Sequence, residues 1–314
     1  VKSNVLGKPM KEPQNVPFEK EGQYLKSDNR SNISYFLEHN VLLRRFTLSV
    51  GVLANYNSAL NEGIHFYPGI DASFRIGDNV RLYGSWNRAL RMPTFTDLYY
   101  EGKTNKGNPD LKPEESEAFE VGLKYNTYFL RAHIAGFYRK GKNMIDWVKE
   151  KPEDIWESQN LTKVDNLGFE TNLSLLPREL GNERFFIRKI ELGYAFIHQD
   201  KDSEGYISNY ALDYLKHKFT AQLSHSIWKG FSATWYVRWQ DRAGSYTKYE
   251  NLKPAYEEPY APYCLVDMKV NWEYQRLNLY AELNNLLNST YYDLGNIPQP
   301  GIWFKAGFRY SFKY

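Results

Sequence analysis

The sequence has no long hydrophobic run. No stretch of its 314 residues approaches the roughly 20 consecutive apolar residues that a transmembrane helix needs, and the mean hydropathy is −0.64. These two facts exclude a helical membrane protein. They do not exclude a transmembrane β-barrel, because its strands alternate lipid-facing and lumen-facing side chains and therefore keep the average hydropathy polar.

Residue patterns typical of disulfides, catalytic sites or metal sites are also scarce. The single cysteine, Cys264, cannot form a disulfide within the chain and is interpreted as a small, half-buried hydrophobic residue. The sequence has no Gly-x-Ser-x-Gly, no His-Glu-x-x-His and no phosphate-binding glycine loop, and its six histidines show no metal-ligand spacing. We therefore predict no enzyme activity, no catalytic residue, no metal site, no cofactor and no nucleic-acid partner.

Aromatic residues, in contrast, are abundant. The chain contains 26 Tyr, 18 Phe and 8 Trp, which together make up 17% of its residues, well above ordinary usage. Many of these rings lie on one face of an alternating segment. In residues 231–240, for example, Phe231, Trp235 and Trp239 share one face, while Tyr236 and Arg238 lie on the other. This period of two predicts a β-strand.

Thirteen segments alternate in this way and are predicted as strands. They cover residues 33–41, 46–56, 66–76, 80–86, 119–125, 128–138, 167–175, 190–196, 219–223, 231–240, 266–274, 277–283 and 302–314. Many are near the roughly 9 to 11 residues that cross a bilayer at a tilt. Their apolar faces are almost free of charge. A membrane barrel requires this, because Lys or Arg on a lipid-facing position costs about 2–4 kcal/mol at the midplane.

The connections between these segments alternate in length. Short turns are expected at 43–45, 77–79, 126–127, 177–184, 228–230 and 275–276, and long loops at 58–63, 89–115, 141–163, 200–211, 241–262 and 286–301. Outer-membrane barrels are built with short periplasmic turns and longer extracellular loops. The pattern therefore favours an all-β, transmembrane antiparallel barrel over a soluble β-sandwich.

The most specific motif lies in and around loop 89–115. Its residues are Arg91, Pro93, Thr94, Phe95, Asp97, Leu98, Tyr99, Gly107, Asn108, Pro109, Leu111, Pro113, Glu114, Ser116, Glu120 and Gly122. With "NLGFE" (166–170), "LNNLLNSTY" (283–291) and an aromatic last strand, this set resembles the TonB-dependent outer-membrane receptors. One departure is that Ile302 follows Gly301, where the family often has Arg.

The resemblance implies a 22-stranded barrel of the Gram-negative outer membrane, plugged by an N-terminal domain. This chain would supply about 13 of those strands, with residues 1–24 as an extracellular loop remnant and residues 25–314 as the C-terminal part of the barrel. An odd number of antiparallel strands cannot close. We therefore expect a further segment, with the plug and about nine strands, to pair with both sheet edges.

The expected partners follow from the same resemblance. They are outer-membrane lipid, a small-molecule nutrient, a TonB energy-coupling complex that acts through the plug, and a surface lipoprotein lid over the loops. The resemblance is greatest to the cobalamin receptors of the family, particularly those of Bacteroidetes. It predicts import of a scarce, bulky nutrient such as vitamin B12, with a ferric siderophore or haem as the alternative.

The candidate ligand contacts are loop residues, most of them aromatic. They are Tyr99, Tyr100, Asn108, Tyr246, Tyr249, Tyr291 and Tyr292. Such rings offer large, rigid contact area to a bulky ligand, although packing of the loops is an alternative role for them. Outside the family, a soluble all-β carbohydrate-binding or adhesin module and an outer-membrane enzyme with a closed barrel remain open.

Overall fold

A computed structural model describes residues 2–3, 6–16, 23–59, 63–151, 153–181, 184–202, 205–208, 214–250 and 253–312. Strands account for 71% of the chain and helices for 3%, which confirms the all-β prediction. Within the described ranges, no helix is long and apolar enough to span a membrane.

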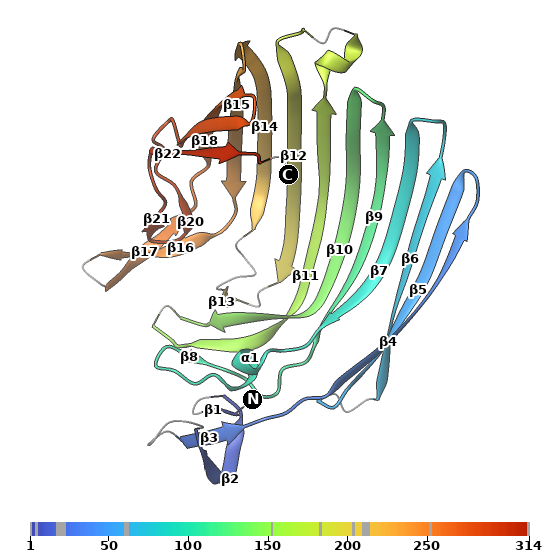
Figure 1. Cartoon of the computed structure of the whole chain (residues 1–314). Helices are drawn as coiled ribbons and strands as arrows, with labels where there is room; N and C mark the ends of the chain where they lie inside the picture. The colour runs from blue at the N-terminus through green and yellow to red at the C-terminus, as the bar shows by residue number, and fades with distance from the viewer. Residues whose placement is uncertain are drawn as a thin grey trace.

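The wall of the molecule is a sheet of thirteen strands that pair in sequence order (Figure 1). They are β4 (Asn32–Leu42), β5 (Phe46–Asn57), β6 (Ile64–Arg75), β7 (Val80–Arg91), β9 (Glu114–Asn126), β10 (Leu130–Lys149), β11 (Trp156–Leu175), β12 (Ile187–Asp202), β14 (Leu215–Trp228), β15 (Phe231–Arg242), β18 (Tyr263–Tyr274), β19 (Leu277–Asn284) and β22 (Trp303–Tyr310). All neighbouring wall strands are antiparallel, as predicted. Two short strands, β8 (Asn105–Lys106) and β13 (Ile207–Ser208), pair beside β11 and β10.

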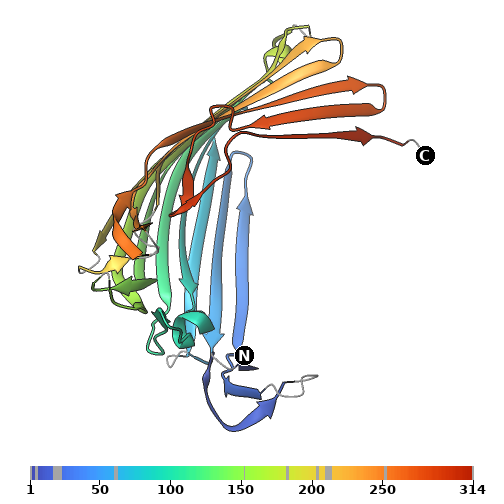
Figure 2. The same cartoon turned by 90° about the vertical axis from the view of Figure 1, so that its left-hand side faces the viewer.

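The pairing register gives the sheet two chemically distinct faces. Val237 lies opposite Val266 on β18, whereas its neighbour Tyr236 lies opposite Asp267. Because facing residues share a side of the sheet, apolar positions gather on one face and polar positions on the other. The sheet curves into an open arc (Figure 2). In the described part of the chain, its two edge strands, β4 and β22, each have one partner.

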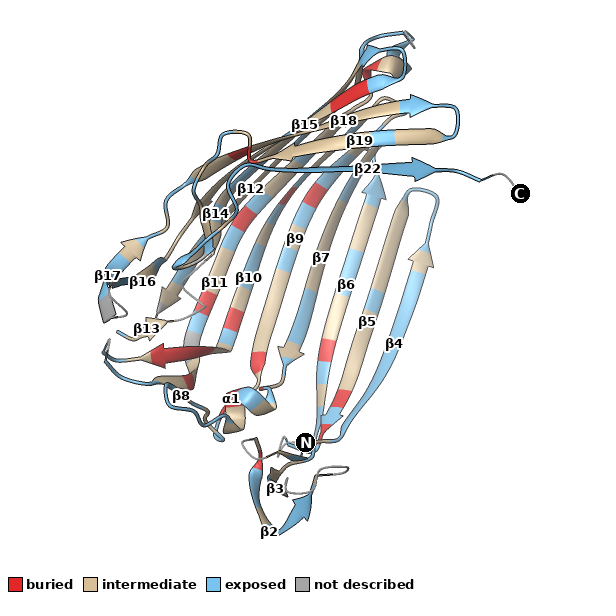
Figure 3. Ribbon diagram, turned by 60° about the vertical axis from the view of Figure 1, so that its left-hand side comes forward, coloured by how far each residue is buried: buried red, intermediate tan, exposed pale blue. Residues whose placement is uncertain are grey.

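Several predicted loops contain strands in the structure. Residues 141–163 do not form an open loop, because β10 and β11 continue to pair as far as Val148 and Glu157. Asp146, Trp147, Val148 and Ser158 are buried in this extension (Figure 3). Residues 241–262 contain the hairpin of β16 (Ser245–Glu250) and β17 (Lys253–Pro259), and residues 286–301 contain β20 (Tyr292–Leu294) and β21 (Ile297–Pro298). Pairing satisfies the backbone groups of these segments.

The N-terminal region and one predicted turn also contain regular structure. The N-terminal region forms a small sheet of β1 (Lys2–Ser3), β2 (Lys8–Asn15) and β3 (Gln23–Ser27), on the side of the wall where β8 and the helix α1 (Phe95–Tyr99) lie (Figure 1). Parts of the predicted loop remnant 1–24, namely residues 1, 4–5 and 17–22, are outside the described residues, as are Lys313 and Tyr314 of the predicted last strand. The predicted turn 177–184 includes a 3-10 helix, Pro177–Leu180.

Candidate functional site

The loop between β7 and β9, here called the motif loop (residues 91–114), is held by its own side chains. Thr94 caps α1: its hydroxyl accepts a bond from the backbone N–H of Asp97 (3.1 Å), and the Asp97 carboxylate accepts one from the backbone N–H of Thr94 (2.9 Å). Arg91 pairs with Asp97 at 3.7 Å and with Glu114 at 3.0 Å. Both carboxylates are buried, so this network anchors the loop to the two strands that carry it.

Asn108 stabilises a turn within the motif loop. Its backbone N–H donates to the carbonyl of Asp97 (2.9 Å), and its side-chain oxygen accepts from the backbone N–H of Asp110 (2.9 Å). Gly107 is required beside it, because a Cβ there would lie 2.8 Å from the carbonyl carbon of Leu98. The side-chain oxygen of Asn108 is therefore used within the loop, and its ligand-binding role stays a prediction.

Tyr99 and Tyr100 follow each other but differ in exposure. The Tyr99 hydroxyl donates to Asp28 (2.5 Å), and its ring stacks on Phe95 at 6.3 Å. Burial, and then the bond to the Asp28 carboxylate, raises the pKa of Tyr99 to about 12. Tyr100 meets the edge of Trp147 (6.5 Å) and is 38% exposed. Of the two, Tyr100 is the ring that a ligand can reach.

The hairpin of β16 and β17, here called the tyrosine hairpin (residues 245–259), rests on packed rings. Tyr246 lies 5.1 Å from Tyr260 and 5.8 Å from Tyr292. Its hydroxyl donates to Glu258 (3.1 Å), which also pairs with Lys248 (2.5 Å). Burial, and then the bond to Glu258, raises the pKa of Tyr246, while the bond from the Lys248 ammonium lowers the pKa of Glu258.

The remaining rings of this group divide into packed and exposed. Tyr291 lies 4.7 Å from Tyr263, whose hydroxyl donates to Asp293 (2.8 Å). On the hairpin, Tyr249 and Tyr256 are 55% and 52% exposed. The structure thus collects the predicted contacts into two groups, one in the motif loop and one at the tyrosine hairpin. Tyr256 is a ring that the site prediction left out, although its position among the loop tyrosines was visible in the sequence.

The second family motif, 283–291, also has a structural role. Asn285 is buried in a left-handed conformation (φ 51°), where its backbone N–H donates to Asp267 (2.7 Å). Its side-chain amide donates to the carbonyls of Ser289 (2.9 Å) and Pro300 (3.2 Å) and accepts from the Ser289 N–H (2.9 Å). These bonds turn the chain out of β19 and tie it to the segment that leads into β22.

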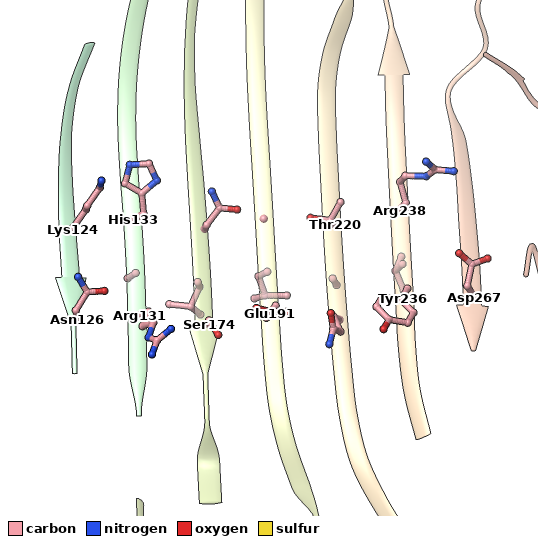
Figure 4. Close-up of a pocket in the computed structure, with 18 residues that line it drawn as sticks. Lys124, Asn126, Arg131, His133, Ser174, Glu191, Thr220, Tyr236, Arg238 and Asp267 are labelled. Atoms are coloured by element: carbon pink, nitrogen blue, oxygen red, sulfur yellow. The ribbon is translucent and has the colours of Figure 1, made fainter. Parts of the chain in front are cut away.

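A hollow of about 620 Å³ lies on the polar face of the wall, and sequence reasoning did not find it. Lys124, Arg131, Glu191, Arg238 and Asp267 line it together with His133 and other residues of β9 to β18 (Figure 4). Alternation predicted which face these side chains occupy, but only the order of strands brings them together. Among the described residues, no three His, Cys, Asp or Glu side chains gather where they could hold a metal ion.

Comparison with known families identifies the chain. Residues 9–286 match the family model described as TonB dependent receptor-like, beta-barrel. The chain belongs to this family. It is therefore an outer-membrane protein, and its family consists of receptors and transporters rather than enzymes. This membership excludes the soluble all-β module considered above. The Bacteroidetes subclass stays a prediction.

Curated relatives within this receptor family carry different names. The chain is 25% identical to a vitamin B12 transporter of Vibrio vulnificus over 55% of this chain and 30% of the relative. It is 26% identical to an iron-regulated outer membrane virulence protein of Vibrio cholerae over 63% of this chain and 33% of the relative. The chain thus spans about a third of the length of these relatives.

Solved receptors show the same fold. A mutant of the ferric enterobactin receptor from Pseudomonas aeruginosa superposes with a TM-score of 0.73 at 19% identity, over 99% of this chain and 48% of that one. The siderophore receptor PirA from Pseudomonas aeruginosa gives a TM-score of 0.66 at 16% identity, over 90% and 47%. At such low identity, the likeness concerns the fold alone.

Proposed function

We propose that this chain supplies wall and loops to a receptor that captures cobalamin at its extracellular face and imports it with TonB-coupled energy. Membership of the TonB-dependent receptor-like family supports the receptor role. Vitamin B12 transporters among the curated relatives, in two Gram-negative species, support the choice of nutrient.

The observation that carries the proposal is the pair of exposed rings on the tyrosine hairpin. Tyr249 and Tyr256 expose more than half of their surface, while Tyr246 of the same hairpin packs against Tyr260 and Tyr292. Strand pairing and the packing of Tyr246 fix the hairpin that carries the two exposed rings, so less backbone freedom is lost when they meet a ligand. Rigid aromatic area of this kind suits a molecule with a large, partly apolar surface.

The cations beside these rings favour a ligand with little net negative charge. Lys248 is paired with Glu258 at 2.5 Å. Arg242 donates to the carbonyl of Asp293 (2.5 Å) and lies 4.7 Å over the ring of Tyr260. An anionic ferric chelate would have to displace these partners to gain ion pairs, whereas bulky cobalamin would not. Uptake of a ferric siderophore or haem is the second candidate, since curated relatives include an iron-regulated outer membrane virulence protein and a ferrienterobactin receptor.

Direct binding tests the proposal. Purified full-length receptor is titrated with cyanocobalamin and with ferric siderophores, and then the variants Tyr249→Ala and Tyr256→Ala are compared. We expect specific cobalamin binding, weakened in both variants. Tyr128→Ala is the control, because Tyr128 is exposed in the turn before β10, at the opposite end of the wall. Cobalamin binding no tighter than nonspecific adsorption would overturn the proposal and promote the siderophore function.

The proposed partners can be tested separately. We propose that a segment with a plug and about nine strands pairs with β4 and β22, which each have one neighbour in the described part of the chain. Backbone amides on the free edge of β4 should then be protected from hydrogen exchange in the full-length receptor, and rapid exchange would contradict this. The TonB complex and a surface lipoprotein lid are proposed from the family alone.

A further inference from the structure

A second hollow, of about 530 Å³, is formed by β4, β5, β6 and β7. Asn32, Asn55, Asn57 and Tyr67 line it, and the register places Asn32 opposite Asn57 across β4 and β5. It borders the motif loop, because Arg30, another lining residue, donates to the carbonyl of Pro93 (2.7 Å). The hollow therefore lies at the same end of the wall as the candidate ligand contacts.

Two buried polar atoms in this hollow have no partner. Asn55 is 6% exposed and Tyr67 is 8% exposed. Neither the side-chain oxygen of Asn55 nor the hydroxyl of Tyr67 makes a hydrogen bond within the described chain. Buried polar groups are rarely left unpaired, because they lose their bonds to water without replacement. Two such groups at one hollow indicate that a hydrogen-bonding group occupies it.

The surrounding amides determine which kind of group fits. The Asn55 amide nitrogen donates to the side-chain oxygen of Asn32 (3.0 Å) and to the hydroxyl of Ser34 (2.8 Å). The Asn57 amide nitrogen donates to the same Asn32 oxygen (3.2 Å). These bonds fix the orientation of Asn55, so its free atom is an acceptor. It requires a donor, whereas the Tyr67 hydroxyl can donate to an acceptor.

We propose that this hollow binds a primary carboxamide group. Its N–H would donate to the Asn55 oxygen, and its carbonyl would accept from the Tyr67 hydroxyl. A carboxylate or phosphate fits poorly, because it would bring only acceptors to the Asn55 oxygen. The nearby cations do not reverse this preference: Arg30 is engaged with Pro93, and Arg88 pairs with Glu115 at 3.7 Å. Asn32 and Ser34 are exposed and leave an entry to the hollow.

This inference rests on the proposed function, since cobalamin carries primary carboxamides around its corrin ring. The other source of the same chemistry is an Asn or Gln side chain of the receptor itself. The two sources predict different effects of removing the Tyr67 hydroxyl. A nutrient carboxamide would make the hydroxyl matter for ligand affinity, whereas a protein side chain would make it matter for the stability of the empty receptor.

The experiment compares cyanocobalamin affinity of the full-length receptor with that of Tyr67→Phe. We expect the variant to bind about 5- to 10-fold more weakly, the loss of one buried hydrogen bond. Without ligand it should melt at the same temperature or higher, because the hydroxyl it loses has no partner. Tyr128→Phe, the same change in an exposed turn, should leave the affinity unchanged.

Cobalamin monocarboxylic acids, with one carboxamide replaced at a time, identify the group. At least one should bind the wild-type receptor more weakly, because its carboxylate brings no N–H to the Asn55 oxygen. Unchanged affinity in Tyr67→Phe, with a lower melting temperature of the empty receptor, would overturn the inference in favour of a protein side chain. Unchanged affinity and stability would overturn it as well. Failure of the wild-type receptor to bind cobalamin would instead overturn the proposed function and the inference with it.

Discussion

The motif loop and the tyrosine hairpin lie at the same end of the wall, yet they use their polar groups differently. In the motif loop, Arg91 pairs with both Asp97 and Glu114, and the two carboxylates are buried. In the tyrosine hairpin, the ion pair of Lys248 and Glu258 is partly exposed and supports rings that face solvent. The loop with the strongest sequence signature is thus the one whose polar side chains mainly bond to other residues of the same loop.

This difference affects how family signatures are interpreted. A motif can recur because every member must build the same turn, as the bonds of Asp97 and Asn108 illustrate. Ligand contacts must instead vary with the ligand, so they need carry no signature. We therefore expect the motif loop to govern stability and the tyrosine hairpin to govern affinity.

The largest expected effect is that of Asp97→Ala. The change removes the Asp97 half of the capping box of α1 and one partner of Arg91, and it leaves the backbone N–H of Thr94 without its acceptor. We expect the free energy of unfolding of the full-length receptor in lipid vesicles to fall by about 2–3 kcal/mol. Thr247→Ala is the control, because its bond to the exposed Glu257 should change stability by less than about 0.5 kcal/mol. Equal losses in both variants would remove the contrast between the loops.

The second effect concerns affinity. Tyr249→Ala deletes an exposed ring without disturbing the packing of Tyr246, so cobalamin should bind about 5- to 10-fold more weakly while the free energy of unfolding stays unchanged. Titration calorimetry and denaturant unfolding measure the two quantities. A larger loss of affinity in Tyr99→Ala, with no loss of stability, would reverse the roles assigned to the two loops.

A smaller effect is expected at high pH in the motif loop. The pKa of Tyr99 is about 12 in the folded protein, above the value of about 10 for an unfolded chain. The neutral hydroxyl therefore stabilises the fold below pH of about 10, and this stabilisation is lost as the pH rises through 12. The difference in tyrosinate absorbance between the wild type and Tyr99→Phe measures the ionisation of Tyr99 as the pH rises. Asp28→Asn should move the ionisation of Tyr99 to lower pH; an unmoved ionisation would show that the Asp28 carboxylate does not contribute to the raised pKa.

The smallest effect is expected at low pH in the tyrosine hairpin. The Lys248 ammonium lowers the pKa of Glu258, so the pair stabilises the hairpin above the ordinary carboxylate pKa of about 4.3 and is lost as the pH falls below it. Solvent exposure keeps the contribution small. Hydrogen exchange of the hairpin amides should accelerate on acidification in the wild type beyond the intrinsic pH trend, and less so in Glu258→Gln. An identical response in both would show that the pair contributes nothing.

The sequence predicted the wall better than the loops, for a physical reason. A strand between lipid and lumen must alternate, and the thirteen strands follow that pattern. Beyond the membrane this constraint ends, so β10 and β11 can continue through residues such as Lys142 and Asn160 without strict alternation. Whether these extensions pair depends on the sequence of the partner strand. The hydrophobic pattern of a single segment carries no information about that partner.

The site was predictable only in part. Composition and loop length pointed to the tyrosines, and the structure gathers them into two groups. Their division into packed and exposed rings depends on contacts between loops, such as that of Tyr246 with Tyr292. The hollow around Asn55 was missed because its lining residues come from different strands. The alternation of side chains along each strand places these residues on the polar face. The register between β4 and β5 then decides that Asn32 meets both Asn55 and Asn57.

The order of strands in the wall has a consequence for how the protein assembles. Each wall strand pairs with the wall strand that precedes it in the chain, so almost all contacts of the sheet close short stretches of sequence. Closing short stretches costs little chain entropy, and structures with local contacts form quickly. The wall can therefore grow one hairpin at a time, with each finished hairpin offering its edge as the template for the next.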